Sequence, residues 1–353
     1  MSTSSRHGNL VMIGGGELGR CSTRIHHDRF NDAERVDDPV VKRRIADGRA
    51  WEKTVIDTLL DGVEPAVVSS SDDAIDTDRP VAVASGVSTV EREAITLSAL
   101  RCGVPLIIGG RLTADRLQAV GAPDLLVRLP DGYAPIDVKH HKAVGRTGIP
   151  ARTTPIGHLT DTDGSVGCFR SGRINDLLQV AHYWRLLEHH GFANPRHRAA
   201  IIGAESPMVV VWVDLQRGNP SILDRYIGAI DDAIVVVVAG RLQPEVPLIP
   251  PVWRGECRSC PWADFCRSEL EAIDHVSLLP AVGAHDTARL LDSGVATTAH
   301  LATLTPGSMH GGYEVTDEAI LQARARASGT LLRRSGVDLT LPSAAHQIDF
   351  DVE

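Results

Sequence analysis

Apolar residues recur along this chain with two different periods, and these periods predict alternating helices and strands. Apolar side chains that return every three or four residues predict helices at 40–62, 90–102, 174–190 and 316–326, and two shorter ones within 277–305. Short apolar runs bounded by glycine, proline or aspartate predict strands at 81–84, 105–108, 125–128, 134–139, 199–202, 208–214 and 233–238. The polar, glycine-containing segment 145–172 is assigned to neither type. The alternation favours an α/β fold.

One predicted hairpin carries charged residues at its open end. Its two strands flank the turn sequence PDG at 130–132. Asp124 precedes the first strand, whereas Asp137 and Lys139 end the second and project from the same face because they are two residues apart. Two carboxylates and an ammonium group are therefore expected to converge. Such a cluster suits Mg²⁺ or Mn²⁺, with a lysine to meet phosphate or activate water. A hairpin with solvated charges is the alternative.

Length and composition indicate an ordinary globular protein with two or three domains. The chain has 353 residues, of which 43% are hydrophobic. The longest apolar run, 233–239, is far shorter than the ~20 residues of a membrane helix. The N-terminus has no apolar signal core. We therefore expect a cytoplasmic protein without a membrane partner.

The charge balance limits where nucleic acid could bind. The 36 Lys and Arg residues are outnumbered by 45 Asp and Glu residues, which gives a net charge of −9. A site for a polyanion must therefore be local. Basic residues do gather near the charged motifs, among them Arg24, Lys142 and Arg173, and a merely solvated charged face is the alternative.

A glycine-rich stretch near the N-terminus suggests a different function. Residues 14–19 match G-x-G-x-x-G after the apolar run 10–13. A dinucleotide-binding fingerprint also requires a helix and a second strand that ends in an acidic residue. The polar and basic sequence that follows does not predict that strand, so dinucleotide binding ranks third among the functions considered.

Three of the six cysteines lie within ten residues of one another. Cys257, Cys260 and Cys266 have a spacing that favours ligation of a metal or cluster over a disulfide framework in a cytosolic chain. Cys102 and Cys168 have no matched spacing and are expected to be a buried thiol and a loop thiol.

Four motifs in a fixed order resemble those of the PD-(D/E)XK nucleases of the RecB-nuclease type. The motifs are Glu52 in a G-x-x-x-E context with Gly48, Asp124 in GAPD, Asp137-Val138-Lys139, and Gln179-x-x-x-Tyr183. The resemblance covers about residues 10–270. It implies an α/β core with a mixed central sheet flanked by helices, and metal-dependent hydrolysis of phosphodiester bonds.

The resemblance also implies a metal site. Asp124 and Asp137 would bind Mg²⁺ or Mn²⁺, and the Val138 carbonyl would complete the coordination shell. Glu52 would be a third ligand, although many relatives carry a histidine at or beside this place in the helix. A role for Glu52 as a surface helix residue is the alternative.

Three further residues have catalytic roles by the same resemblance. Lys139 would orient or deprotonate the attacking water and stabilise charge in the transition state. Gln179 and Tyr183 would position the DNA backbone or the metal-bound water.

The cysteines are similar to those of the iron–sulfur subgroup of this family, which includes AddB-type nuclease domains and the CRISPR-associated adaptation nuclease. In that subgroup Cys21 would join Cys257, Cys260 and Cys266 around a [4Fe–4S] cluster that staples the two ends of the nuclease domain together. Zinc is the alternative, since four thiolates also bind Zn²⁺ tetrahedrally.

The C-terminal third suggests additional modules. The nuclease domain is expected at 1–270 and a helix-hairpin-helix-like domain at 271–335. In that domain Gly283 is present and Ala281 takes the place of the second usual glycine. Contact with a DNA phosphate and a packing role are both open. The segment 336–353 ends in IDFDVE, which resembles the start of a DEDD-type ribonuclease-H-like domain; an acidic tail is the alternative.

The function expected from these features is a metal-dependent DNA nuclease. It would act as an exonuclease on single-stranded DNA ends in repair or recombination, with a helicase or repair partner left unidentified. Arg24, Lys142, Arg173 and Gly283 are the expected DNA contacts. His26, His27, His140 and His141 are expected to touch phosphates or solvent. The alternative is a catalytically silent iron–sulfur module that binds DNA or assists assembly.

Overall fold

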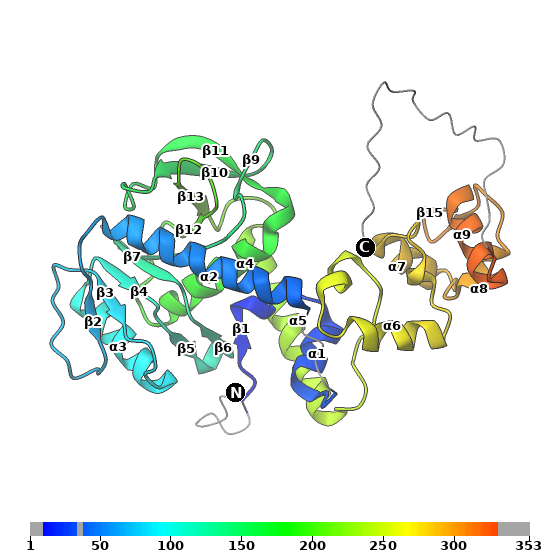
Figure 1. The fold of residues 1–353 in the computed structure, drawn as a ribbon, viewed down its shortest axis with the longest axis horizontal. Helices are drawn as coiled ribbons and strands as arrows, with labels where there is room; N and C mark the ends of the chain where they lie inside the picture. The colour runs from blue at the N-terminus through cyan, green and yellow to red at the C-terminus, as the bar shows by residue number, and fades with distance from the viewer. Residues whose placement is uncertain (1–9, 34–37, 331–353) are drawn as a thin grey trace. The chain divides into compact units, whose positions relative to one another are not determined.

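The computed structural model describes residues 10–33 and 38–330, which belong to two compact units, Met1–Pro250 and Pro251–Glu353 (Figure 1). The unit boundary lies 20 residues before the expected one at 270, so the cysteine segment 257–266 belongs to the second unit. The whole segment 336–353, which includes IDFDVE, lies outside the described residues.

The first unit is built around a sheet of ten strands with helices against it. The sheet has the order β2-β3-β4-β7-β8-β12-β13-β10-β11-β9, and a smaller sheet has the order β1-β6-β5. The helices are α1 (Ser22–Phe30), α2 (Pro39–Leu60), α3 (Thr89–Cys102), α4 (Ile174–His189) and α5 (Ile222–Leu242). The strands are β1 (Ile13–Gly14), β2 (Ala66–Val68), β3 (Val81–Val83), β4 (Leu106–Ile108), β5 (Leu112–Ala114), β6 (Ala119–Gly121), β7 (Leu125–Leu129), β8 (Gly132–Val138), β9 (Val144–Gly145), β10 (Gly148–Pro155), β11 (Ser165–Arg170), β12 (Arg198–Ile202) and β13 (Val209–Asp214). Parallel and antiparallel pairs are mixed, so the expected α/β fold with a mixed sheet flanked by helices is confirmed.

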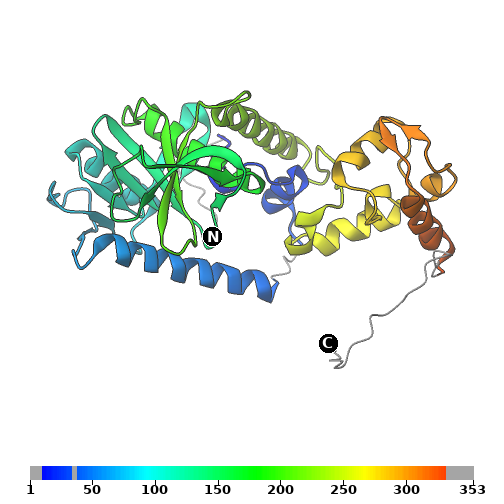
Figure 2. The same ribbon diagram turned by 90° about the horizontal axis from the view of Figure 1, so that it is seen from above.

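Alternating side chains give the sheet an apolar layer on each face. In β12, Ala199 and Ile201 join the core that contains α4, whereas Ala200 and Ile202 join the core against which α2 packs. Strand side chains point to opposite faces in turn, so one short strand supplies both layers. Figures 1 and 2 show α2 lying along one face of the sheet.

The two helices that flank the site begin and end as their sequences predict. In α2, Asp38 is the N-cap and accepts a hydrogen bond from the Val40 N–H, and Pro39 occupies the first turn. Asp61 is the C-cap and has a left-handed backbone conformation. In α4, all residues from Leu177 to Leu187 except Gln179 and Arg185 are buried. The predicted boundaries of both helices differ from the observed ones by at most two residues.

The strand predicted at 233–238 is wrong. These residues belong to α5, which begins with a capping box between Ser221 and Asp224. The β-branched run favours a strand locally, but the buried residues Tyr226, Ile230, Ala233 and Val237 are spaced three or four apart. Helical burial over the longer segment therefore overrides the local preference.

The segment 145–172 contains strands that the sequence does not indicate. β10 and β11 form an antiparallel hairpin, and β10 also pairs with β13, with Arg152 opposite Trp212. Only Ala151 and Thr154 of β10 are buried. The hairpin lies toward the edge of the sheet and lacks the alternating apolar pattern that marks a half-buried strand.

The glycines at 14–19 allow close packing against α4. After β1 the chain forms a 3₁₀ turn, η1 (Gly15–Glu17), in which Glu17 accepts a hydrogen bond from the Gly14 N–H. A Cβ on Gly15 would lie 3.2 Å from Gln179 Cγ, and one on Gly19, where φ is +70°, would lie 2.3 Å from the Asn175 amide oxygen. The described residues that follow form α1 and then α2, without the second strand of a dinucleotide-binding fold.

Three of the individual expectations for this unit are wrong. His26 and His27 are buried, at 1% and 3% exposure, and the His26 ring lies 5.2 Å from the Phe30 ring. They face the interior because they lie on the side of α1 that packs against α5. Cys102 is exposed at the C-terminus of α3, and Cys168 lies in β11 and not in a loop.

The second unit has its own small helical core. It contains η4 (Gly255–Ser259), α6 (Ala263–Ala272), η5 (Val276–Leu278), α7 (Ala284–Asp292), α8 (Thr298–Ala302), β14 (Met309–His310), β15 (Tyr313–Glu314) and α9 (Asp317–Ser328). The two short helices within 277–305 and the helix near 316–326 are therefore confirmed.

The turn before α7 favours a packing role over a phosphate contact. Gly283 is the N-cap of α7, and the preceding Ala281 N–H already donates to Gln322 Oε1 at 2.9 Å. The Val282 N–H donates to the Leu279 carbonyl at 2.9 Å. Two backbone donors of this turn thus have protein partners.

None of the helices in the described parts of the chain combines the length and apolar composition needed to cross a bilayer.

Candidate active site

The β7–β8 hairpin brings the two predicted aspartates together. In the antiparallel register, Leu125 pairs with Ile136. Asp124 precedes Leu125 and Asp137 follows Ile136, so the two aspartates lie at the same end of the hairpin. Asp124 Oδ2 accepts a hydrogen bond of 2.7 Å from the Val138 N–H. The hairpin and its convergent charges are confirmed. The second strand ends one residue before Lys139.

Asp137 is at the centre of the cluster. Its side chain is buried at 2% exposure, and its Oδ1 accepts a hydrogen bond of 3.3 Å from Gln179 Nε2. Its Oδ2 forms an ion pair with Lys139 Nζ and otherwise accepts no hydrogen bond from the described residues. Asp137 and Lys139 therefore project from the same face of the sheet, as their spacing predicts.

Helix α4 fixes the lysine through one glutamine. Gln179 Oε1 accepts a hydrogen bond of 2.9 Å from Lys139 Nζ, and Gln179 Nε2 donates to Tyr183 Oη at 2.7 Å. Tyr183 packs so closely on β6 that a Cβ on Gly121 would lie 2.7 Å from its Cδ1 atom. Burial raises the pKa of Tyr183 far above its usual range, so its hydroxyl stays protonated. The predicted helical pair is thus in contact with the predicted strand pair.

Glu52 reaches the same cavity from α2. Its side chain is half-buried, and burial followed by the charge of Asp137 raises its pKa, against smaller opposing effects of Arg49 and Lys139. Glu52 therefore lies in the same cavity as the predicted strand residues, and its role as a metal ligand stays a prediction.

All three carboxyl groups have raised pKa values, and burial is the largest cause in each. Burial and then the charge of Asp137 raise the pKa of Asp124 well above its usual range, although the Val138 N–H opposes this. Burial also raises the pKa of Asp137, despite the neighbouring Lys139. Burial lowers the pKa of Lys139, but the surrounding aspartates outweigh this effect and raise it, so the lysine is held as a cation. A single buried lysine thus faces several carboxyl groups.

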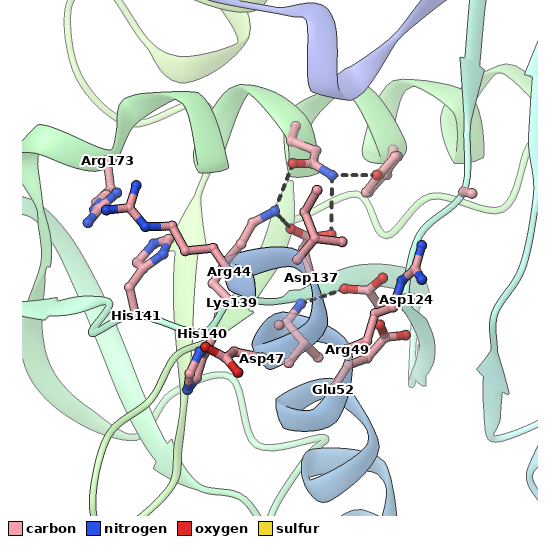
Figure 3. Close-up of a pocket in the computed structure, with 16 residues that line it drawn as sticks. Arg44, Asp47, Arg49, Glu52, Asp124, Asp137, Lys139, His140, His141 and Arg173 are labelled. Atoms are coloured by element: carbon pink, nitrogen blue, oxygen red, sulfur yellow. Dashed lines mark hydrogen bonds and ion pairs between the residues drawn. The ribbon is translucent and has the colours of Figure 1, made fainter. Parts of the chain in front are cut away.

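These residues line a polar cavity of about 710 Å³, which Figure 3 shows from close by. Its lining residues are Arg44, Ile45, Asp47, Gly48, Arg49, Glu52, Ala122, Asp124, Asp137, Val138, Lys139, His140, His141, Arg173, Gln179 and Tyr183. All of the residues predicted as catalytic or metal-binding therefore lie in one cavity.

The predicted DNA contacts are more scattered. Arg173 lines this cavity, whereas Lys142 lines a separate hollow of about 390 Å³ with Glu205 and Thr153. Arg24 forms an ion pair of 3.5 Å with Asp28 and does not line the cavity. Gly283 belongs to the second unit.

Two arginines of α2 belong to the site without having been predicted. Arg44 and Arg49 line the cavity together with Gly48 and Glu52. The sequence does carry a signal for one of them, because Arg44, Gly48 and Glu52 are spaced four apart and so share one side of a helix.

Two neighbouring histidines, His140 and His141, also line the cavity. Asp176 of α4 has its Oδ2 2.8 Å from His141 Nε2.

The donor atoms fit a hard divalent cation better than a soft one. Asp124 and Asp137 offer carboxylate oxygens, one of which is buried and accepts no hydrogen bond from the described residues. No three His, Cys, Asp or Glu side chains in residues 10–33 and 38–330 gather closely enough to form a metal site. The paired aspartates are therefore the core of the candidate site. Glu52 lines the same cavity, but its side chain does not form a three-residue metal cluster with them among the described residues.

The cysteines occupy two different units. Cys21 precedes α1 in the first unit, while Cys257 lies in η4, Cys260 follows it and Cys266 lies in α6 of the second unit. Cys257 is buried and the other three are partly exposed. The cluster inferred from their spacing stays a prediction.

Comparison with models of protein families gives no match, and comparison with curated proteins gives none either. The functional inference therefore depends on the chemistry of the site.

Replacement of Asp124 by asparagine is expected to stabilise the metal-free protein. At neutral pH the raised pKa means that ionised Asp124 destabilises the fold, and asparagine keeps an oxygen for the Val138 N–H. We expect the free energy of unfolding in urea with EDTA to rise by about 1–3 kcal/mol at pH 8. The gain should shrink as the pH falls, because the wild-type carboxyl group then binds a proton in the folded state.

The matched control is Asp232→Asn on the exposed side of α5, which should change the free energy of unfolding by less than about 0.5 kcal/mol. A variant Asp124→Asn that is less stable than wild type at pH 8 would show that the carboxylate is not electrostatically unfavourable.

Proposed function

We propose that this chain is a divalent-metal-dependent nuclease of the PD-(D/E)XK type that hydrolyses phosphodiester bonds in DNA. The observation that carries the proposal is the contact set of Asp124, Asp137, Lys139 and Gln179 in one polar cavity. Paired carboxylates and a fixed ammonium group suit a hard cation and an anionic substrate respectively.

The carboxyl groups are difficult to explain as a stabilising feature of the fold. Burial raises the pKa of both Asp124 and Asp137, which means that the ionised pair costs folding free energy. Groups with such shifted pKa values in a cavity are typical of functional sites. A need for negative charge in the working protein accounts for their presence.

Asp124 and Asp137 would bind Mg²⁺ or Mn²⁺, with the Val138 carbonyl as a further donor and Glu52 available from α2. When bound, the cation would supply a water of lowered pKa and neutralise charge on the phosphate. The protein's part is to hold two carboxylates at one end of a hairpin, which the Val138 N–H and Gln179 do.

Lys139 would act as a charged donor and not as a base. Its ammonium group is held between Asp137 and Gln179 Oε1, and the neighbouring carboxylates raise its pKa. A lysine held in this state can orient a water or stabilise negative charge on the phosphate oxygens. It keeps its proton at neutral pH and so does not act as the base. Gln179 sets its position and Tyr183 sets that of Gln179.

The cationic residues of the cavity support DNA as the substrate. The whole chain carries a net charge of −9, yet Arg44, Arg49 and Arg173 all line the cavity. Local positive charge in an acidic protein directs a polyanion to one place. We propose single-stranded DNA ends as the substrate, with exonucleolytic cleavage in repair or recombination.

Lys139→Ala is expected to slow cleavage severely. The variant removes the fixed ammonium group, and we expect the rate of degradation of labelled single-stranded DNA with Mg²⁺ or Mn²⁺ to fall by about 10²–10⁴-fold. Lys53→Ala is the matched control, because Lys53 is exposed on α2 beside Glu52 and pairs only with Asp57 among the described residues. Wild-type rates in Lys139→Ala would refute the catalytic role.

Binding of DNA by the wild type without cleavage in any divalent metal would favour the silent DNA-binding module.

The [4Fe–4S] cluster is proposed from the resemblance of the four cysteines to those of the iron–sulfur subgroup. Protein purified without oxygen is expected to be brown, with a broad absorption band in the visible blue, and Cys257→Ser should lose that band. The control is Cys102→Ser, which changes an exposed thiol outside the motif. A colourless wild-type protein that contains zinc would replace the cluster by a structural zinc site.

A further inference from the structure

Two arginines at one end of the cavity have no acidic partner in the part of the chain that the structure describes. Arg44 comes from α2 and Arg173 directly precedes α4, and both side chains line the cavity while exposed to solvent. Neither side chain makes a hydrogen bond or ion pair with any of the described residues. Figure 3 shows the Arg44 side chain reaching across toward Arg173, with His141 beside them.

Acidic groups in and beside the cavity have other partners. Asp176 Oδ2 is 2.8 Å from His141 Nε2, and Asp47 forms an ion pair of 4.0 Å with Arg43. The carboxyl groups of Asp124 and Asp137 contact the Val138 N–H, Gln179 and Lys139. The positive charge of Arg44 and Arg173 is thus left for a ligand.

The carboxyl groups and the two arginines lie at different ends of the cavity. Figure 3 shows Asp124 and Glu52 at one end, with Arg49 beside them, and Arg44, Arg173 and His141 at the other, with Lys139 between. Two guanidinium groups directed toward one another repel unless an anion lies between them. Guanidinium groups bind phosphate oxygens through paired N–H donors, so the anion that suits this end is a phosphate.

We propose that Arg44 and Arg173 form a second phosphate subsite, which binds the phosphodiester group next to the scissile one in single-stranded DNA. The assignment of the scissile position rests on the proposed function. A strand bound at both ends of the cavity would have one phosphate at the carboxylate cluster and its neighbour held between α2 and the start of α4. Both arginines act on the same phosphate.

The test measures DNA binding in the absence of cleavage. Binding of a fluorescein-labelled single-stranded 12-nucleotide DNA to the full chain is followed by fluorescence anisotropy in EDTA, over a series of salt concentrations. Arg44→Ala and Arg173→Ala should each weaken binding roughly tenfold at low salt, because each loses a charge-assisted contact. Each should also make the slope of log K against log salt concentration shallower, by up to about 0.7. The double variant should lose less than the product of the two single losses.

Arg170→Ala is the matched control. Arg170 is exposed three residues before Arg173 at the end of β11 but does not line the cavity, so this variant should bind DNA as the wild type does. Unchanged binding in Arg44→Ala and Arg173→Ala, or an equal loss in Arg170→Ala, would overturn the subsite. Full additivity in the double variant would overturn the shared phosphate.

The outcome separates this inference from the proposed function, because binding in EDTA does not depend on hydrolysis. A wild-type protein that fails to cleave DNA with any divalent metal, but whose two arginine variants bind more weakly, refutes the nuclease and not the phosphate contact. A wild-type protein that cleaves DNA, with arginine variants that bind normally, refutes only the subsite.

Discussion

The structure depends at its centre on two aspartates buried at the end of one hairpin beside a single lysine. Asp137 is almost fully buried, its Oδ2 contacts the Lys139 ammonium group, and Asp124 is held one strand away by the Val138 N–H. Burial and mutual repulsion raise the pKa of Asp124, which means that the protein holds the pair together against an electrostatic cost. Much of the surrounding architecture can be understood as support for this arrangement.

Close backbone contacts provide that support. Gly15 and Gly121 leave room for Gln179 and Tyr183, so α4 can approach the strands until Gln179 contacts both Asp137 and Lys139. On the other face, the core beneath α2 includes Val55 and fixes the helix that carries Glu52. The same helix carries Arg44, so one element supplies both a carboxylate and a cation to the cavity.

Sequence reasoning worked best where the local pattern and the tertiary burial agree. The β7–β8 hairpin follows from strand-length apolar runs around a PDG turn, and its charged end follows from the period of a strand. Glu52, Gln179 and Tyr183 lie on helices whose buried sides are clear in the sequence, which is why their meeting in one cavity could be expected. Periodicity alone does not tell which helices and strands lie next to one another. The expectation that these residues meet came from the order of the four motifs.

The failures occurred where burial is decided by distant parts of the chain. The β-branched run in α5 has the composition of a strand, and only the packing of Tyr226, Ile230 and Val237 shows its helical period. The hairpin of β10 and β11 is polar because few of its side chains enter the core. His26 and His27 resemble surface groups in a basic segment, yet α5 covers them.

The most direct measurement of the central claim is the binding of Mn²⁺ by isothermal titration calorimetry in two buffers of different ionisation enthalpy. We predict that Mn²⁺ binds the wild-type protein and releases more protons as the pH of the titration is lowered, because carboxyl groups with raised pKa values must lose their protons to coordinate a cation. We also predict binding at least tenfold weaker in Asp137→Asn, which lacks one of the paired carboxylates. A wild-type protein that binds no Mn²⁺, or an Asp137→Asn variant that binds it equally well, would contradict the account.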